Sequence, residues 1–303
     1  MASTDTNARL DSGFGPALAA LLAGAVALGF SAIFVRLAAA EGIGPFASAF
    51  WRVALSLPVL YAWMRIEEAS ERRAHRIFGR ASLHAGLAFA GDLFFWHLAI
   101  MNTTVANATF FATTAPVFVV LITWLVLRRH VAAATWAGLG LCLLGGAALV
   151  GASLQLDPAH VRGDLQGVAT AFFFGLYFLF VARARAGAGA ARVTFEAGVV
   201  TALVLLPVAL VLDGNPVPAT AKGWLWLAGL AWISHAAGQG LLSVALGRLP
   251  ATFSSLVIFL EAVATAGFGW IILAERVTVI QACGGALILL GIYVARPRNG
   301  AAA

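Results

Sequence analysis

Polar and charged side chains interrupt the long apolar stretches of this sequence, and they are where chemistry is possible. Asp92 and Trp96 are four residues apart, as are His235 and Gln239. Each pair is therefore expected on one face of a helix. An aspartate beside an aromatic ring can bind the ammonium group and ring of an amino acid, or a flat cation by cation–π attraction.

Arg52 and Glu261 also lie inside apolar segments. A charge at the centre of a membrane span costs at least about 2.5 kcal/mol, so such a residue usually faces a partner or a water-filled cavity. The sequence therefore predicts a substrate site made by Arg52, Asp92, Trp96, His235, Gln239 and Glu261. Two alternatives stay open: Arg52 could pair with Asp92 or Glu261 instead of a substrate, and Trp96 could be ordinary packing.

Four further polar residues fall within or beside the apolar segments: His97, Asn102, Asn107 and Glu196. His97 is compatible with a hydrogen-bonded core histidine. Glu196 is expected near the cytoplasmic end of its helix, where the carboxylate can reach water.

The sequence lacks the common motifs of enzymes and ATP-driven pumps. It has no Gly-x4-Gly-Lys-Ser/Thr run, because its only lysine, Lys222, follows Ala221. Cys142 and Cys283 have no second Cys or His at metal-ligand spacing. We expect no cofactor and no metal, and we disfavour an intramembrane lipid-modifying enzyme. A channel is disfavoured as well, because no polar stripe repeats along the spans.

The composition indicates a protein whose solvent is lipid. Of 303 residues, 61% are hydrophobic and 11% are charged, whereas soluble domains are roughly 25% charged. The net charge of +6 does not indicate nucleic-acid binding, because the basic residues are spread thinly between apolar runs. The expected partners are the lipid bilayer and a small-molecule substrate.

Apolar runs of about 20 residues, the length that crosses a bilayer, occur ten times. They predict an all-α membrane protein whose ten transmembrane helices form two five-helix repeats. We expect a cytoplasmic tail at 1–16, a first repeat at 17–152, a second repeat at 163–296 and a cytoplasmic tail at 297–303. The spans fall near 17–37, 45–65, 83–101, 104–127, 132–152, 164–183, 193–212, 223–246, 251–273 and 277–296.

The arginines and lysines predict the orientation. The N-terminal tail, the even-numbered connectors and the C-terminal tail carry 14 of the 19 basic residues. The opposite side has at most Arg36, Arg162, Lys222 and Arg276. Because basic loops stay in the cytoplasm, both termini are expected there, in a multi-pass protein of the inner membrane.

The chain aligns with itself at an offset of 146 residues. This offset pairs Trp124 with Trp270, Gly138 with Gly284 and Gly145 with Gly291. It also places His235 opposite Phe89 and Gln239 opposite Leu93. Five helices is an odd number, so the second copy must be inverted in the membrane, as in many transporters. The paired glycines are seven residues apart and are expected to allow close helix packing.

Short motifs carry a family resemblance. They are the segment Ala115 to Phe118, the matching Leu260 to Val263, Leu273 to Glu275 opening into Val277, and Gly284 with Gly291. With these features the sequence resembles the drug/metabolite transporter superfamily, in its ten-helix branch with two EamA-type repeats. Two positions depart from the pattern: Ala262 stands where a proline is usual, and Arg129 replaces the glutamate of the first repeat.

The resemblance implies a central cavity walled by helices one to four and six to nine, with helices five and ten at the periphery. It is most similar to bacterial exporters of aromatic amino acids and paraquat. The expected function is therefore alternating-access export of a small amphiphilic solute, driven by the solute gradient or by proton exchange. Nucleotide sugars and drug-like molecules are alternative substrate classes, and the oligomeric state is not specified.

Overall fold

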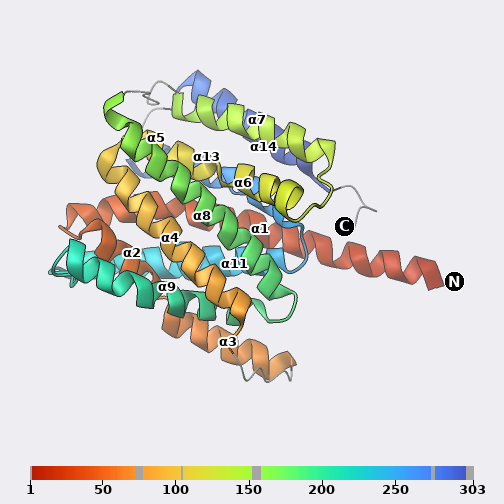
Figure 1. Ribbon diagram of the computed structural model, residues 1–303, viewed down its shortest axis with the longest axis horizontal. Coiled ribbons are helices and arrows are strands. Elements are labelled where there is room, and N and C mark those ends of the chain that lie inside the picture. The colour runs from red at the N-terminus through yellow and green to blue at the C-terminus, as the bar shows by residue number, and fades with distance from the viewer. Residues whose placement is uncertain (1, 72–77, 104, 152–157, 274–276, 298–303) are drawn as a thin grey trace.

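The protein is described by a computed structural model that covers residues 2–71, 78–103, 105–151, 158–273 and 277–297. All of its regular elements are helices, packed as one bundle (Figure 1). The first half contains α1 (Ala2–Ala40), α2 (Pro45–Ala54), α3 (Leu57–Glu71), α4 (Arg80–Asn102), α5 (Val105–Thr113), α6 (Ala115–Leu121), the π-helix η1 (Ile122–Val126) and α7 (Ala133–Val150). The second half contains the 3-10 helix η3 (Pro158–His160), α8 (Val161–Arg185), α9 (Ala190–Leu212), α10 (Ala221–Gly229), the π-helix η4 (Leu230–Gln239), α11 (Gly240–Leu246), α12 (Ala251–Val257), α13 (Phe259–Leu273) and α14 (Val279–Ala295).

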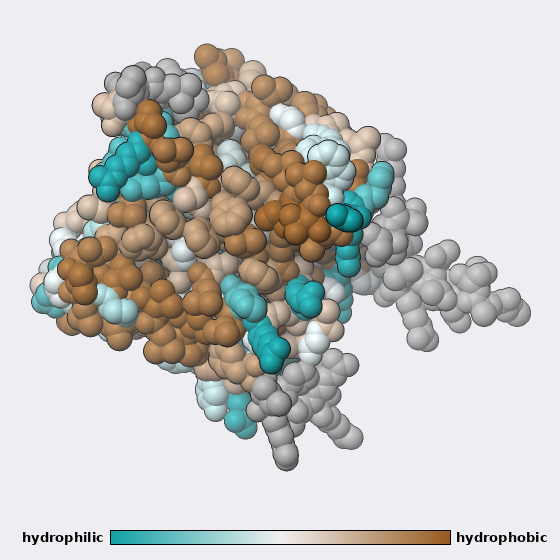
Figure 2. Space-filling model, in the orientation of Figure 1, coloured by the Kyte–Doolittle hydropathy of each residue, from teal (hydrophilic) through white to brown (hydrophobic). Residues whose placement is uncertain are grey.

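The ten predicted spans correspond to helical segments of the described chain. Eight are long and apolar enough to cross a bilayer by themselves. Helix α14 is shorter, at 17 residues, and the eighth predicted span is divided into α10, η4 and α11. Figure 2 shows hydrophobic side chains over most of the visible face, with hydrophilic residues gathered toward its margins. The prediction of an all-α membrane protein is confirmed.

Several details differ from the sequence prediction. Helix α1 begins at Ala2, not near residue 17, and extends beyond the bundle (Figure 1). The predicted second and ninth spans are each divided into two helices, and the fourth is divided into α5, α6 and η1. The C-terminal tail from 298, the basic segment 72–77 and the motif residues Ala274 and Glu275 lie outside the described residues.

Two of these divisions occur at related places in the halves. The fourth span is broken at Thr114, two residues before Pro116, whose ring excludes the carbonyl of the preceding helical turn. The ninth span is broken at Ile258, where no proline is present. Hydroxyls flank both breaks and donate to carbonyls three residues earlier: Thr114 to Phe111 at 2.6 Å and Ser255 to Thr252 at 3.0 Å. Such side-chain hydrogen bonds compete with the helical ones and bend a helix.

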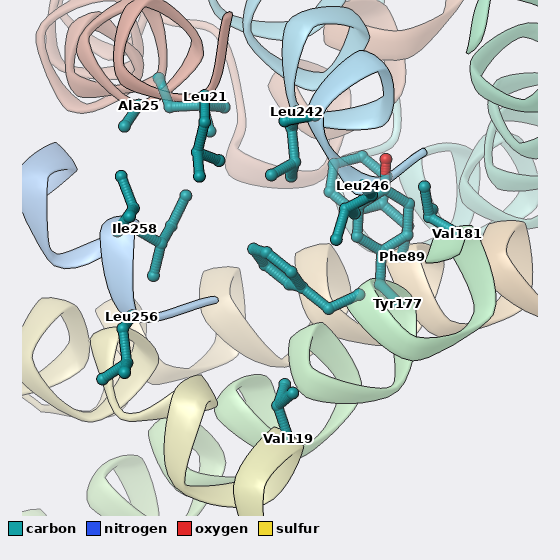
Figure 3. Close-up of a cluster of buried hydrophobic side chains, with 14 of the residues drawn as sticks. Leu21, Ala25, Phe89, Val119, Tyr177, Val181, Leu242, Leu246, Leu256 and Ile258 are labelled. Atoms are coloured by element: carbon teal, nitrogen blue, oxygen red, sulfur yellow. The ribbon is translucent and has the colours of Figure 1, made fainter. Parts of the chain in front are cut away.

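A layer of apolar side chains fills the space between the two halves. Leu21 and Ala25 from α1 face Leu242 and Leu246 from α11, while Tyr177 of α8 lies beside them (Figure 3). These side chains are almost fully buried. In lipid, tight packing of this kind is the main attraction between helices, because a bilayer supplies no hydrophobic drive for their association.

Helices α7 and α14, the fifth and tenth spans, pack on each other at one edge of the bundle (Figure 1). A Cβ added to Gly145 would lie 2.6 Å from the Gly284 oxygen, and one added to Gly138 would lie 2.5 Å from the Gly291 oxygen. The lower-numbered glycine of one helix thus faces the higher-numbered glycine of the other, so the two helices are antiparallel. The predicted close approach at these four glycines is confirmed.

We expect Gly145→Leu to lower the melting temperature of the detergent-solubilised protein, because the added side chain has no room against the α14 backbone. Overpacking of this kind costs about 1–3 kcal/mol. Gly140→Leu is the matched control on the same helix, since a Cβ at Gly140 meets nothing within 4 Å. Equal melting temperatures for the two variants would contradict the close packing.

Candidate functional site

A cavity of about 80 Å³ lies at the centre of the bundle. Since a buried water needs about 10–15 Å³ on this measure, the space holds several waters or part of a small solute. Side chains from the first, second, third, fourth, sixth, eighth and ninth spans line it. They are Leu28, Ser31, Ala32, Arg52, Phe89, Asp92, Leu93, Trp96, Thr109, Ala112, Thr113, Thr170, Phe174, Gln239, Ile258, Glu261, Ala262 and Thr265.

Five of the six residues predicted from the sequence line this cavity. Asp92 and Trp96 reach it from α4, where regular helical spacing keeps them on one face. Arg52 comes from α2 and Gln239 from the end of η4. Glu261 lies in the first turn of α13, directly after the break at Ile258. Broken helices of this kind form the solute sites of several transporter folds.

His235 is the exception. It is 1% exposed, and its ring lies 5.3 Å from the ring of Phe89, centroid to centroid. Phe89 lines the cavity and His235 does not. His235 and Gln239 both lie in the π-helix η4. The Phe89 ring, which lines the cavity, packs against the imidazole of His235 and takes its place in the wall.

Charge dominates the polar part of the wall. Arg52 is 6% exposed and Asp92 is 8% exposed, and Arg52 interacts electrostatically with both Glu261 and Asp92. No salt bridge joins them among the described residues, and the Nε atom of Arg52 has no hydrogen-bond partner. With all three groups ionised, one positive and two negative charges leave the wall with one net negative charge.

Aromatic rings form another part of the wall, and the sequence analysis singled out only Trp96 among them. The Cζ atom of Arg52 lies 5.8 Å from the centroid of Phe89. Phe89 also contacts Tyr177, with ring centroids 4.9 Å apart. In the sequence, the offset of 146 residues pairs Phe89 with His235. In the structure, the rings of these two residues are in contact. A residue touches its own counterpart only near the axis that relates the halves.

Hydroxyl groups of the wall were also missed by the sequence analysis. Thr113 and Thr170 donate to backbone carbonyls at 2.7 and 3.1 Å, which leaves their oxygens free to accept. The Oγ of Ser31 and the Oε1 of Gln239 are buried without hydrogen-bond partners. Leaving buried polar atoms unpaired costs about 1–3 kcal/mol each, and a polar solute or water in the cavity would remove that cost.

The remaining polar residues singled out in the sequence lie elsewhere. The Nδ1 of His97 is 2.6 Å from the Leu93 oxygen, while its Nε2 has no partner. Asn102 donates to Gln166 at 3.1 Å, and Asn107 donates to Asp164 at 2.9 Å.

Glu196 was expected to reach water, but it is 3% exposed. Its Oε1 accepts from Arg192 at 2.9 Å and its Oε2 from the Gly79 N–H at 3.1 Å. These two donors take the place of water, which is why the carboxylate can be buried near the start of α9.

A solved crystal structure has the same fold, with a TM-score of 0.78 and 19% sequence identity over 94% of this chain and 96% of the other. Two proteins of Archaeoglobus fulgidus, each described as an uncharacterized transporter, are related in sequence. One is 26% identical over 87% of this chain and 91% of its own length. The other is 27% identical over 65% of this chain and 69% of its own length.

The family model of the EamA-like transporter family matches this chain twice, at residues 15–151 and 161–296. The two matches cover both halves of the bundle and every residue that lines the cavity. This chain, a multi-pass membrane transporter and not an enzyme, therefore belongs to the EamA-like transporter family.

Proposed function

We propose that this transporter exports small amphiphilic metabolites by alternating access, with aromatic amino acids and organic cations as its substrates. The observation that carries the proposal is a cavity lined by two carboxylates, one guanidinium and aromatic rings. Asp92 and Glu261 supply anionic partners for an ammonium group, and Arg52 supplies a cationic partner for a carboxylate. Trp96 and Phe89 supply apolar faces that can hold a ring or a flat cation.

The charged groups of the cavity favour some substrate classes over others. A nucleotide sugar brings at least two negative charges, and the cavity offers Arg52 against two carboxylates. Polyanions are therefore disfavoured by repulsion in a site of low dielectric constant. A drug-like molecule without a positively charged group offers Asp92 and Glu261 no cationic partner, whereas the ammonium group of an amino acid does.

The organisation of the chain supports alternating access. The proposed halves are 17–152 and 163–296, with short tails at 1–16 and 297–303. The antiparallel contact of α7 with α14 is what inverted repeats require. Two inverted halves can exchange conformations, which turns an outward opening into an inward one.

Uptake into proteoliposomes of four aromatic solutes of different charge tests the substrate class. We expect saturable uptake of L-phenylalanine, phenyltrimethylammonium and paraquat, but not of 3-phenylpropionate, because the anion meets two carboxyl groups and only Arg52 as a cationic partner. Asp92→Asn should slow uptake of the two cations about tenfold or more, because it removes a carboxylate charge that attracts them in a site of low dielectric constant. Gln239→Ala should abolish uptake of L-phenylalanine.

Glu41→Gln is the matched control, because this carboxylate lies in the connector between α1 and α2, outside the cavity. Equal uptake of the anion and the monocation would contradict the charge argument. If none of the four solutes is taken up, the substrate assignment is wrong, and the protein carries another solute.

We also propose proton exchange, because a proton on Asp92 or Glu261 neutralises the cavity when no cation is bound. Phenyltrimethylammonium keeps its charge at every pH, so an acidic vesicle lumen cannot trap it passively. We expect an acidic lumen to accelerate its uptake, because protons leaving the lumen drive the cation inward. Glu261→Gln should remove this acceleration. Uptake that ignores the pH gradient in the wild type would reject the coupling.

We further propose that the protein lies in the inner membrane with both termini in the cytoplasm, as the basic connectors indicate. In a background of Cys142→Ala and Cys283→Ser, an impermeant maleimide should label Ser70→Cys from the cytoplasmic side. The same reagent should label Asn215→Cys from the opposite side. Labelling of both cysteines from one side would overturn this orientation.

A further inference from the structure

The start of α2 is held by a carboxylate from the other half of the chain. Asp213, at the C-terminal end of α9, accepts a hydrogen bond of 2.7 Å from the N–H of Ala47 in the first turn of α2. The Asp213 carboxylate packs so closely on Gly44 that a Cβ there would collide with it. A carboxylate at this end of a helix also interacts favourably with the helix dipole.

The start of α9 is held in the same way from the first half. Glu67, near the C-terminal end of α3, accepts hydrogen bonds from the N–H groups of Ala190 and Ala191 at 2.9 and 3.0 Å. A Cβ on Gly189 would collide with the Glu67 carboxylate. The α2–α3 segment and α9 thus each receive, at the start, a carboxylate from the end of the other. We call Asp213 and Glu67 the two carboxylate caps.

The two carboxylate caps are related by the internal repeat. Glu67 and Asp213 are 146 residues apart, and Gly44 and Gly189 are 145 apart. The two glycines precede their helices with nearly the same backbone angles, φ −64° and ψ 156° against φ −63° and ψ 158°. Because α9 is antiparallel to the α2–α3 segment, one cap lies at each membrane face.

Both caps are formed at once, and this separates them from gates. In the outward-open and inward-open states of inverted halves, a gating contact that is closed on one face has its counterpart open on the other, whereas both caps are closed here. We infer that Glu67 and Asp213 instead hold the second and seventh spans together as a fixed pair in both the outward-open and inward-open states. This inference rests on the alternating access proposed above.

The fixed pair has a consequence for the solute site. Arg52 lies on α2, less than two turns after the Asp213 cap. Asp92, Gln239 and Glu261 lie on other helices, α4, η4 and α13. Asp213 and Glu67 are therefore positioning residues: they keep Arg52 in place while the helices that carry the other polar groups change the opening of the cavity.

Cross-linking tests the fixed pair without any transported solute. In the background of Cys142→Ala and Cys283→Ser, we place a reporter at Ser31→Cys, because Ser31 lines the cavity and its hydroxyl is unpartnered. Oxidation then links Gly44→Cys to Asp213→Cys in one variant and Glu67→Cys to Gly189→Cys in another. Maleimide labelling of residue 31 is followed from each membrane face by peptide-resolved mass spectrometry, before and after reduction of the cross-link.

We expect labelling from both faces to be unchanged by either cross-link. Loss of labelling from the face of the cross-link, restored by reduction, would show that the cap is a gate and would overturn the inference. Labelling of the reduced protein from one face only would overturn the alternating access on which the inference rests. The two failures are therefore distinguishable.

A second test uses variants that keep the glycines, in case a protein with a cysteine pair does not fold. We expect Asp213→Asn and Glu67→Gln each to lower the melting temperature, while the ratio of labelling from the two faces at Ser31→Cys stays constant. A cap that favoured one state would change this ratio about fivefold or more, in opposite directions for the two variants. Glu41→Gln is the matched control.

Discussion

The constraint on which this structure depends is that charge inside a bilayer must be compensated by the protein itself. Arg52, Asp92 and Glu261 lie within membrane-spanning helices, where each charge costs at least about 2.5 kcal/mol. They are placed around one cavity, at a range where they interact electrostatically without a salt bridge. An incompletely matched set of charges leaves a site that a charged solute or a proton can complete, which a closed ion pair would not do.

The residues that pack the helices are matched between the two halves, whereas the charged residues of the cavity are not. Positions that hold helices together are matched across the repeat: Gly138 with Gly284, Gly145 with Gly291, and Glu67 with Asp213. Positions that give the cavity its charge are not matched, since Arg52, Asp92 and Glu261 correspond to Ala197, Gly238 and Ala115. Matched packing allows two related conformations, whereas a solute without two-fold symmetry requires an asymmetric binding wall.

The places where helices are broken or become π-helical were mostly not predictable from the sequence pattern. Pro116 predicts a disturbance of the fourth span, but nothing comparable predicts the break at Ile258 or the π-helix at residues 230–239. Glu261, directly after the break, and Gln239, at the end of the π-helix, reach the cavity, while His235 packs against the Phe89 ring. The spacing of four residues correctly predicted that Asp92 and Trp96 share one face, because α4 is a regular helix.

The sequence by itself determined that the protein is helical, spans a membrane and is built from two related halves. Hydrophobic run length and the offset of 146 residues are properties of the chain that need no tertiary contact to be read. The tertiary structure decided which polar residues share the cavity, that Phe89 and the threonines join them, and that Asp213 and Glu67 cap helices of the opposite half. The two caps join residues 166 and 123 positions apart, and only the packing of specific helices brings such residues within hydrogen-bonding distance.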